Sequence, residues 1–261
     1  MSCAWGAAQI AMTRDSAHNL TQGTYEALRA DLLACRIAPG SKLKIQELCN
    51  RLSVSLGAIR EALSRLTSEG LVVSEPQRGF RAAPISLADL RDLTMVRIEV
   101  ESLCLRRAIE VGTVEWEVRL VAAYHRLSRT PERPASDPMR SDDEWADAHA
   151  AFHLALVDGA DSPWLLRLHG QLYAQSERYR RLSIPLGGSD RNVGREHHDI
   201  LDAALKRDTD GAVALLTQHL NHTTEILLQA NIEGHATAMT RVPEKPIRGQ
   251  HNSKYRKARA K

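Results

Sequence analysis

The chain has 261 residues, more than most single domains, so one or two domains are expected. Hydrophobic residues make up 43% of it but aromatic residues only 4%, which favours packed helices with Leu, Ala and Val in the core over a β-sandwich. The net charge of +3 is too small to indicate a partner by itself. No apolar run approaches the ~20 residues of a membrane span, and the N-terminus does not resemble a signal peptide. We therefore expect a soluble, cytoplasmic protein with no membrane partner.

The first 84 residues are predicted to form a flexible arm, over 1–20, and a small domain, over 21–84. Apolar residues at helical spacing, separated by turn residues, predict three helices in the domain. These helices are expected from Thr21 to the turn at Ala38–Gly40, over Ile45–Leu52 and over Leu56–Glu69. Two β-prone runs on either side of the sequence EPQRG then predict a hairpin that ends at Pro84.

The second and third helices have the spacing of a helix-turn-helix. The third helix has four apolar residues at i, i+3, i+4 and i+7, which predict one buried face: Ile59, Ala62, Leu63 and Leu66. A turn over Ser53–Ser55 could set the third helix at a steep angle, suited to a DNA major groove, with the hairpin as the wing of a winged helix-turn-helix. The candidate DNA-binding residues are Ser55, Leu56, Gly57, Arg60, Ser64, Arg78 and Gly79. The alternative is a structural helical hairpin that contacts no nucleic acid.

Residues 85–234 are predicted to form an all-α bundle of six helices. Capping boxes begin two of these helices, at Ser86 and Ser141, and no run in this region has the pattern of a strand. The final segment, 235–261, is polar and has no periodicity, so it is predicted to be a disordered tail. It carries eight Lys or Arg after residue 240 and one acid. Such a tail either adds contacts to DNA phosphates or is only solvated.

Several spaced motifs connect both halves of the chain to a known family. The first half contains a PG..L turn, L..RL.VS, REAL.RL...GLV and a glycine at the tip of the hairpin. The second half contains VRIEVE, AFHLAL followed by SPWLL, EHHDILDAAL and a later HL pair. Together they resemble GntR-family transcription regulators of the FadR-like subgroup, which carry an FCD-type C-terminal domain. The resemblance implies a DNA-binding domain followed by an effector-binding and dimerisation domain.

The resemblance also implies roles for residues of the first half. Arg60 matches an arginine that contacts phosphate or base, Ser55 a capping hydroxyl next to phosphate, and Arg78 a residue of the wing tip. Leu56 departs from the family, which commonly has arginine at that position. Because Leu56 offers only apolar contact, for instance to a thymine methyl group, an altered operator preference is expected.

Four histidines are placed to meet inside the bundle. His149 and His153 lie at i and i+4 on one helix, and His197 and His219 lie on two later helices. Such a set suits a divalent metal, Zn or Ni best, although eleven histidines on helices can also share a face by accident. The resemblance implies that His153, His197 and His219 are metal ligands. His149 occupies the position at which many members have Asp, so the set is either four imidazoles or three with His149 turned aside.

Two arginines are candidates for effector binding. The resemblance places Arg97 near the effector cavity, where it could clamp a carboxylate through two hydrogen bonds. The alternative for Arg97 is a surface ion pair with Glu101, four residues later. Arg178 is the second candidate.

The predicted function is a transcription regulator, a repressor, that binds a palindromic DNA operator as a homodimer. A small carboxylate effector, held through the metal in the bundle, would control DNA binding. Two other classes remain open: a metallohydrolase built on the histidines, and a non-specific architectural DNA-binding protein favoured by the basic tail. The sequence has no H-E-x-x-H motif and no Glu one turn from His149 or His153, which argues against the hydrolase.

Overall fold

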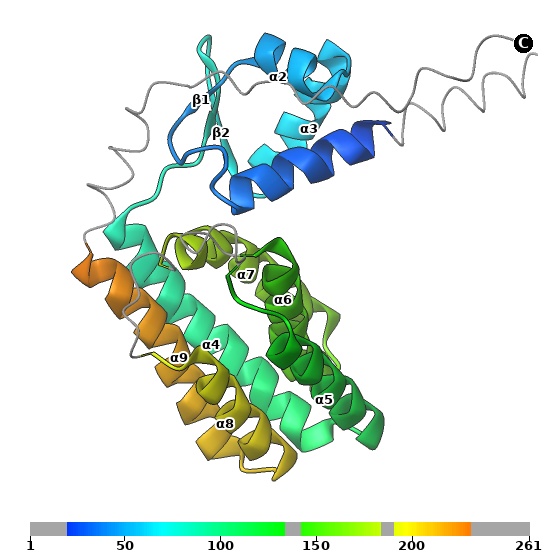
Figure 1. Ribbon diagram of the computed structural model, residues 1–261, viewed down its shortest axis with the longest axis vertical. Coiled ribbons are helices and arrows are strands. Elements are labelled where there is room, and N and C mark those ends of the chain that lie inside the picture. Colours follow the sequence, from blue (N-terminus) through cyan, green and yellow to red (C-terminus); the bar gives the residue numbers. More distant parts are fainter. Residues whose placement is uncertain (1–19, 134–141, 184–190, 231–261) are drawn as a thin grey trace, which may run out of the picture.

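The computed structural model describes residues 20–133, 142–183 and 191–230. The basic tail expected over 235–261 lies outside these ranges, as does the arm expected over 1–20 except for its last residue. Figure 1 shows two parts, a small N-terminal domain and a helical bundle, with the domain above one end of the bundle. The chain crosses from one to the other at the start of the long helix α4.

The N-terminal domain combines helices with a small antiparallel sheet. Its elements are a helix over residues 20–33, β1 (Lys42–Leu43), α2 (Ile45–Leu52), α3 (Leu56–Ser68), β2 (Val72–Glu75) and β3 (Gly79–Ala82). The strand order is β1-β3-β2, with Lys42 opposite Arg81 and Val72 opposite Ala82. The hairpin of β2 and β3 is the predicted one. Strand β1 is not predicted by the sequence, because two residues are too short to display a period of two.

An apolar core fixes the angle between α2 and α3. All four residues predicted for the buried face of α3 are fully buried: Ile59, Ala62, Leu63 and Leu66. Leu48 of α2 is buried in the same cluster, and Val54 of the connecting turn packs against it. Ser53 takes a left-handed conformation, with φ 55°, and thereby ends α2. The predicted helix-turn-helix packing is therefore confirmed.

Six α-helices form the bundle within the described residues, which confirms the predicted all-α architecture. They are α4 (Leu87–Val111), α5 (Val114–Arg129), α6 (Asp143–Val157), α7 (Pro163–Ser183), α8 (Val193–Leu205) and α9 (Thr209–Gln229). Helix α4 packs against α6, α7 and α9 and runs through the middle of the bundle (Figure 1). A short 3-10 turn, Asp158–Ala160, connects α6 to α7. The largest buried core side chains include Trp116, Phe152 and Ile200.

Side-chain caps fix where these helices begin. Ser86 Oγ accepts the backbone N–H of Asp89 at 3.0 Å, as predicted from the sequence. Helix α6 differs from the prediction, because its N-cap is Asp142 and not Ser141. The Asp142 carboxylate accepts the backbone N–H of Glu144 at 2.8 Å, and a negative charge is favourable at a helix N-terminus.

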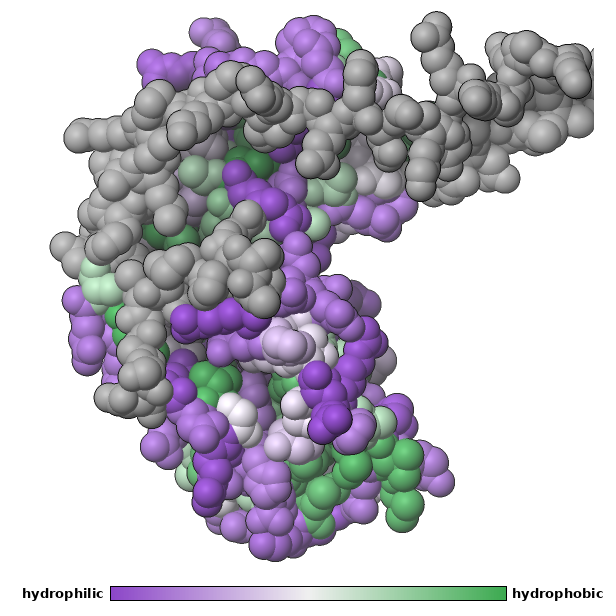
Figure 2. Space-filling model, in the orientation of Figure 1, coloured by the Kyte–Doolittle hydropathy of each residue, from purple (hydrophilic) through white to green (hydrophobic). Residues whose placement is uncertain are grey.

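The visible surface of the bundle is mostly hydrophilic, with a broad apolar area at one end (Figure 2). Figure 2 shows apolar side chains at the lower right, over α5, where Val114, Val118 and Val121 are exposed. Their i, i+4, i+7 spacing places them on one face of the helix. None of the helices in the described ranges combines the length and the apolar character that a membrane span requires.

Candidate functional site

The outer face of α3 carries the candidate DNA-binding residues. Ser55 caps the helix, because its Oγ accepts the backbone N–H of Ala58 at 3.2 Å. Leu56 and Gly57 follow at the exposed leading end, and the Leu56 side chain is 47% exposed. Arg60 and Ser64 are exposed one turn apart, opposite the buried face. The leading end and the outer side of α3 are therefore exposed.

The hairpin that follows α3 carries the other candidate DNA-binding residues at its tip. Arg78 is exposed in the turn between β2 and β3. Gly79 begins β3 with φ 90°, a conformation that side chains strain, so glycine suits this position. The turn is closed by the Arg78 N–H, which donates to the Glu75 carbonyl at 3.0 Å. The wing tip thus presents one cation to solvent.

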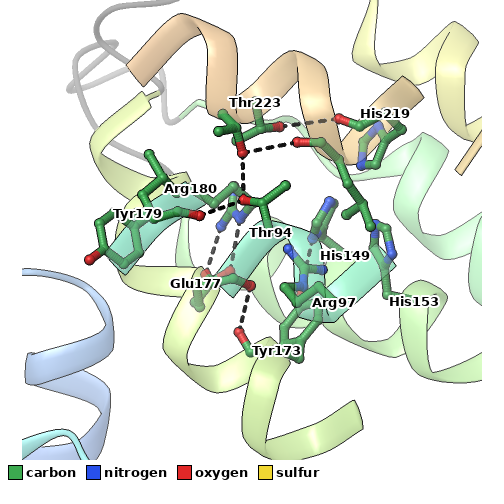
Figure 3. A pocket seen from close by; sticks show the side chains of 14 residues that line it. Thr94, Arg97, His149, His153, Tyr173, Glu177, Tyr179, Arg180, His219 and Thr223 are labelled. Carbon is green, nitrogen blue, oxygen red and sulfur yellow. Dashed lines mark hydrogen bonds and ion pairs between the residues drawn. The ribbon is translucent and has the colours of Figure 1, made fainter. Parts of the chain in front are cut away.

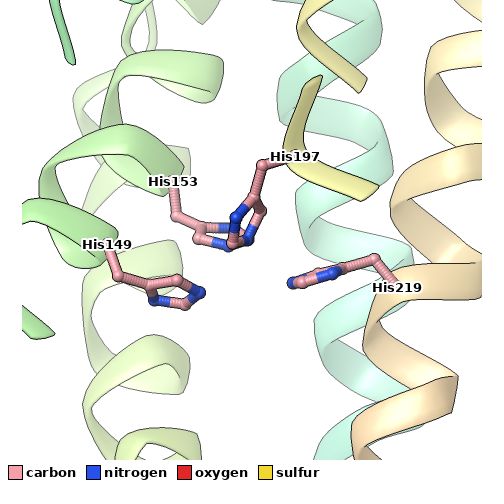
Figure 4. A group of neighbouring side chains, drawn as sticks. All are labelled: His149, His153, His197 and His219. Carbon is pink, nitrogen blue, oxygen red and sulfur yellow. The ribbon is translucent and has the colours of Figure 1, made fainter. Parts of the chain in front are cut away.

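The structure brings the four predicted histidines together inside the bundle (Figure 4). His149 and His153 come from α6, His197 from α8 and His219 from α9. Each offers one ring nitrogen, and these four nitrogens lie within 4.8 Å of one another. All four side chains are buried, with at most 5% exposed. The group can hold a metal ion. Asp147 is exposed on another face of α6 and is not part of the group.

Burial keeps these imidazoles neutral. It lowers the pKa of His149, His153 and His197 well below 6.5, and that of His219 in the same direction. The neighbouring imidazoles add to this effect, because each disfavours a positive charge on the next. A neutral imidazole has a free lone pair, which is the form that binds a metal.

Unpaired nitrogens are the strongest indication of a missing ligand. Among the described residues, neither ring nitrogen of His153 has a hydrogen-bond partner, nor does Nε2 of His197. Buried polar atoms are nearly always paired in folded proteins, and leaving one unpaired costs about 1–3 kcal/mol. A metal at the centre of the cluster would bind one nitrogen of each ring and would thereby satisfy one of the two on His153, so the donor set fits a metal. His169, whose two ring nitrogens also have no partner within the described ranges, lies outside the set.

Two further side chains orient the histidines. His219 Nδ1 donates to Glu196 Oε2 at 2.7 Å, and Arg191 holds the same carboxylate at 2.7 Å. Burial alone would raise the pKa of Glu196, but His219 and Arg191 outweigh it and hold the pKa well below its usual value. His149 Nδ1 shares a hydrogen bond of 2.8 Å with the Tyr173 hydroxyl. Such outer contacts fix the rings of metal-binding histidines.

A small cavity of about 30 Å³ adjoins the cluster, and Figure 3 shows the side chains around it. His149, His153 and His219 form one wall, with Thr94, Arg97, Tyr173, Glu177 and Arg180 among the other lining residues. Glu177 accepts two hydrogen bonds from Arg180, at 2.7 and 2.8 Å, and one from Arg181 at 2.8 Å, so its buried carboxylate is fully paired. The cavity is therefore polar and lies directly beside the imidazoles.

Arg97 forms the ion pair with Glu101 and also lines the cavity. Its Nε donates to Glu101 at 2.8 Å, and both side chains are shielded, with 13% and 1% exposed. The ion pair is therefore buried and not on the surface. The same guanidinium lines the cavity and lies 5.8 Å from the centre of the Tyr173 ring.

Arg178 is not placed to bind an effector in this cavity. Its guanidinium donates to the backbone carbonyls of Ala83 and Pro84, where the N-terminal domain joins α4. The side chain is only 4% exposed. The physical reason is its position on α7, since Glu177 and Arg180 face the cavity while Arg178 faces the N-terminal domain.

Sequence reasoning missed Glu196, Tyr173 and Glu177. Glu196 directly precedes His197, so its proximity to the cluster could have been suspected from the EHHD sequence. Its pairing with His219 depends on the register between α8 and α9, which no local pattern specifies. Tyr173 and Glu177 lie four residues apart on one helix, but only the packing of α7 against α4 directs them inward.

Two protein-family models match the chain. The model for bacterial regulatory proteins of the gntR family matches residues 20–81, which include α3 and the wing. The model for the FCD domain matches residues 92–222, which include the four histidines.

Curated relatives cover most of the chain. The HTH-type transcriptional regulator BphR of Paraburkholderia xenovorans, itself uncharacterized, is 42% identical over 81% of this chain and 86% of its own length. The HTH-type transcriptional repressor GlaR of Escherichia coli is 34% identical over 79% of this chain and 94% of its own. Among solved structures, E. coli McbR/YncC has the same fold, with a TM-score of 0.65 over 81% of this chain and 98% of that chain at 21% identity.

These matches agree with the winged helix-turn-helix and the helical bundle described above. They also favour a transcription regulator over a metallohydrolase, because the family and the relatives are regulators and not hydrolases. The chain therefore belongs to the gntR family of bacterial regulatory proteins and is a DNA-binding transcription regulator with an FCD domain.

Proposed function

We propose that this regulator is a repressor that binds a palindromic operator as a homodimer and is controlled by a small carboxylate held at a divalent metal. It would act in the cytoplasm, where the bacterial chromosome lies. The observation that carries the proposal is the set of four buried, neutral imidazoles with unpaired nitrogens, next to a polar cavity in a chain with a winged helix.

The donor set favours Zn²⁺ or Ni²⁺ among divalent ions. His149, His153, His197 and His219 supply nitrogen only, and imidazole suits these borderline metals better than Mg²⁺ or Mn²⁺, which prefer oxygen. A bound cation would supply the positive charge that a buried carboxylate needs in a region of low dielectric. The carboxylate of Glu196 would remain outside the cluster and orient His219.

Arg97 is the second anchor that we assign to the effector. Its Nε is engaged by Glu101, while its guanidinium lines the cavity beside His153 and His219. The terminal N–H groups of the same guanidinium could donate charge-assisted hydrogen bonds to a carboxylate. Arg97 is already paired with Glu101, and Glu177 with Arg180 and Arg181, so the effector's charge would be balanced mainly at the metal while Arg97 contributes a hydrogen bond.

The DNA-binding role of α3 and the wing rests on exposure and charge. Arg60 is exposed on the outer face of α3, Leu56 at its leading end and Arg78 at the wing tip. One winged helix covers only half of an operator, so a palindrome requires two copies of the chain. Two E. coli relatives, GlaR and RspR, the second 31% identical, are transcriptional repressors, which supports repression here.

A DNA selection experiment tests this function. Full-length protein would be used to enrich fragments from a random double-stranded library, followed by footprinting of the selected sequence. The expected result is an inverted repeat bound by two chains, with Arg60→Ala weakening protection and the exposed control Arg129→Ala leaving it unchanged. Enrichment of no sequence, or binding of one chain to an asymmetric site, would contradict the proposal.

A further inference from the structure

Helix α7 contacts the candidate metal centre along one side. Tyr173 reaches His149 through the hydrogen bond of 2.8 Å, and Tyr173, Glu177 and Arg180 line the cavity. The Tyr173 phenol is buried, and burial raises its pKa far above the ordinary value, so it stays protonated. A change in the position of His149 would therefore act directly on the phenol of α7.

The same helix contacts the end of the recognition helix α3. The Gln175 side chain donates to the backbone carbonyl of Glu69, the residue that ends α3. Gly70 follows with φ 72°, and a Cβ at that position would approach Gln175 Nε2 to 3.1 Å. The glycine thus allows both the left-handed turn and the close approach of α7.

Helix α7 also holds the segment that leaves the wing. Arg178 donates to the carbonyl of Ala83 and, at 3.2 Å, to that of Pro84, directly after β3. In return, the Arg178 carbonyl accepts a hydrogen bond from the Cys35 thiol at 3.5 Å. Arg178 is 4% exposed and Ala83 is buried, so removing Arg178 would take a hydrogen bond from the buried Ala83 carbonyl. Helix α7 therefore contacts both the C-terminal end of α3 and the segment that follows the wing.

An exposed ion pair also joins the two parts of the molecule. Arg36 contacts Asp143, at the start of α6, at 2.9 Å, but the Asp143 side chain is 62% exposed. Exposed ion pairs contribute little and are screened by salt. The buried contacts of α7 are consequently the stronger connection.

We propose that α7 transmits the state of the histidine site to the recognition helix. Tyr173 receives the change at His149, and Gln175 and Arg178 act as positioning residues that set the end of α3 and the exit of the wing. Residues 173 and 178 are five positions apart, which is about 7.5 Å along a helix that moves as a rigid element. This inference rests on the proposed function of the metal site.

The test compares DNA binding by zinc-free and zinc-loaded full-length protein, with the DNA fragment that the wild type selects. The wild type should show dissociation constants that differ by about 5-fold or more between the two forms. By linkage, that DNA should change the zinc affinity by the same factor. The titration of DNA and the titration of zinc therefore measure the same coupling free energy between the two sites.

Three variants separate transmission from simple stability. Gln175→Ala should still fold, bind zinc with the wild-type affinity and bind DNA. Tyr173→Phe should also fold and bind DNA, but it loses the contact that orients His149, so its zinc-loaded form is measured at saturating zinc. In both variants the ratio of dissociation constants should approach one. Arg36→Gln removes the exposed bridge to Asp143 and a local ion pair with Asp31, but no contact of α7; it is the matched control and should keep the wild-type ratio. Wild-type ratios in both Tyr173→Phe and Gln175→Ala would overturn the role of α7.

The wild type alone can also overturn the inference, if zinc and DNA both bind but do so independently. A chain that binds no zinc, or selects no DNA, is a different result, because it would overturn the proposed function together with this inference.

Discussion

His219 Nδ1 and Glu196 Oε2 are joined by a hydrogen bond of 2.7 Å between α9 and α8. Because an ionised carboxylate can only accept, the proton lies on Nδ1 of His219, which leaves Nε2 with the lone pair. Arg191 holds the same carboxylate from another direction. Glu196 thereby fixes the form of the imidazole that a metal requires.

Glu196→Gln is expected to lower the affinity for Zn²⁺ by about 10- to 100-fold, because loss of such an outer partner frees the imidazole and reduces its basicity. Competition against a chromophoric chelator measures this affinity. Glu225→Gln, an exposed change on the same helix α9, is the control and should bind like the wild type. Equal affinities for both variants would refute the role of Glu196.

His149→Asp should shift the metal preference from Zn²⁺ and Ni²⁺ toward Mn²⁺ and Mg²⁺. The change replaces one nitrogen donor with an oxygen donor and adds a negative charge, which harder ions prefer. The ratio of Zn²⁺ to Mn²⁺ affinity is the quantity to measure. His149→Asn, which adds no charge, should move this ratio less. An unchanged ratio in His149→Asp would place His149 outside the ligand set.

The stability of the metal-free protein should fall as the pH drops below about 6.5. Burial lowers the pKa of the four clustered histidines, so they stay neutral in the folded state while the unfolded chain takes up protons. Each such group lowers the free energy of unfolding by up to ~1.4 kcal/mol per pH unit, and above pH ~6.5 it contributes no slope.

Urea unfolding at pH values on both sides of 6.5 measures this dependence. His153→Leu should reduce the slope, because it removes one buried imidazole. His198→Asn is the matched control, since that side chain is 57% exposed and the slope should not change. A free energy of unfolding that is constant or increases on acidification would contradict the predicted linkage.

Arg60→Ala should weaken binding to the selected operator by ~1–3 kcal/mol if Arg60 contacts a base or a well-aligned phosphate. Leu56→Arg should change the preferred sequence, because it adds a side chain that can read guanine at the leading end of α3. Repeating the DNA selection with each variant checks both outcomes. If both variants select the wild-type sequence with wild-type affinity, the outer face of α3 does not read DNA.

Local patterns in the sequence were sufficient for most of the fold. The spacing of Ile59, Ala62, Leu63 and Leu66 predicted a buried face, and the structure buries all four. The hydroxyls of Ser55 and Ser86 predicted helix starts, and both accept capping hydrogen bonds. Strand β1 was beyond this reasoning, because its pairing with β3 is a contact between distant segments.

Local patterns also predicted only a part of the candidate site. His149 and His153 could be placed together from their spacing, since i and i+4 share a helix face. Whether Arg178 faced the cavity could not be determined, because it is adjacent to Glu177 and Tyr179 and only the docking of the N-terminal domain selects its direction. Residues that act through contacts between helices, such as Glu196, leave no local signal.

The metal content of the purified chain tests the central claim most directly. Full-length protein prepared without an affinity tag or chelator would be analysed for elements, followed by thermal unfolding with added Zn²⁺ or Ni²⁺. We expect about one Zn or Ni per chain, and a rise in melting temperature when the metal-free protein is loaded. The absence of stoichiometric metal, together with a melting temperature that neither ion changes, would contradict it.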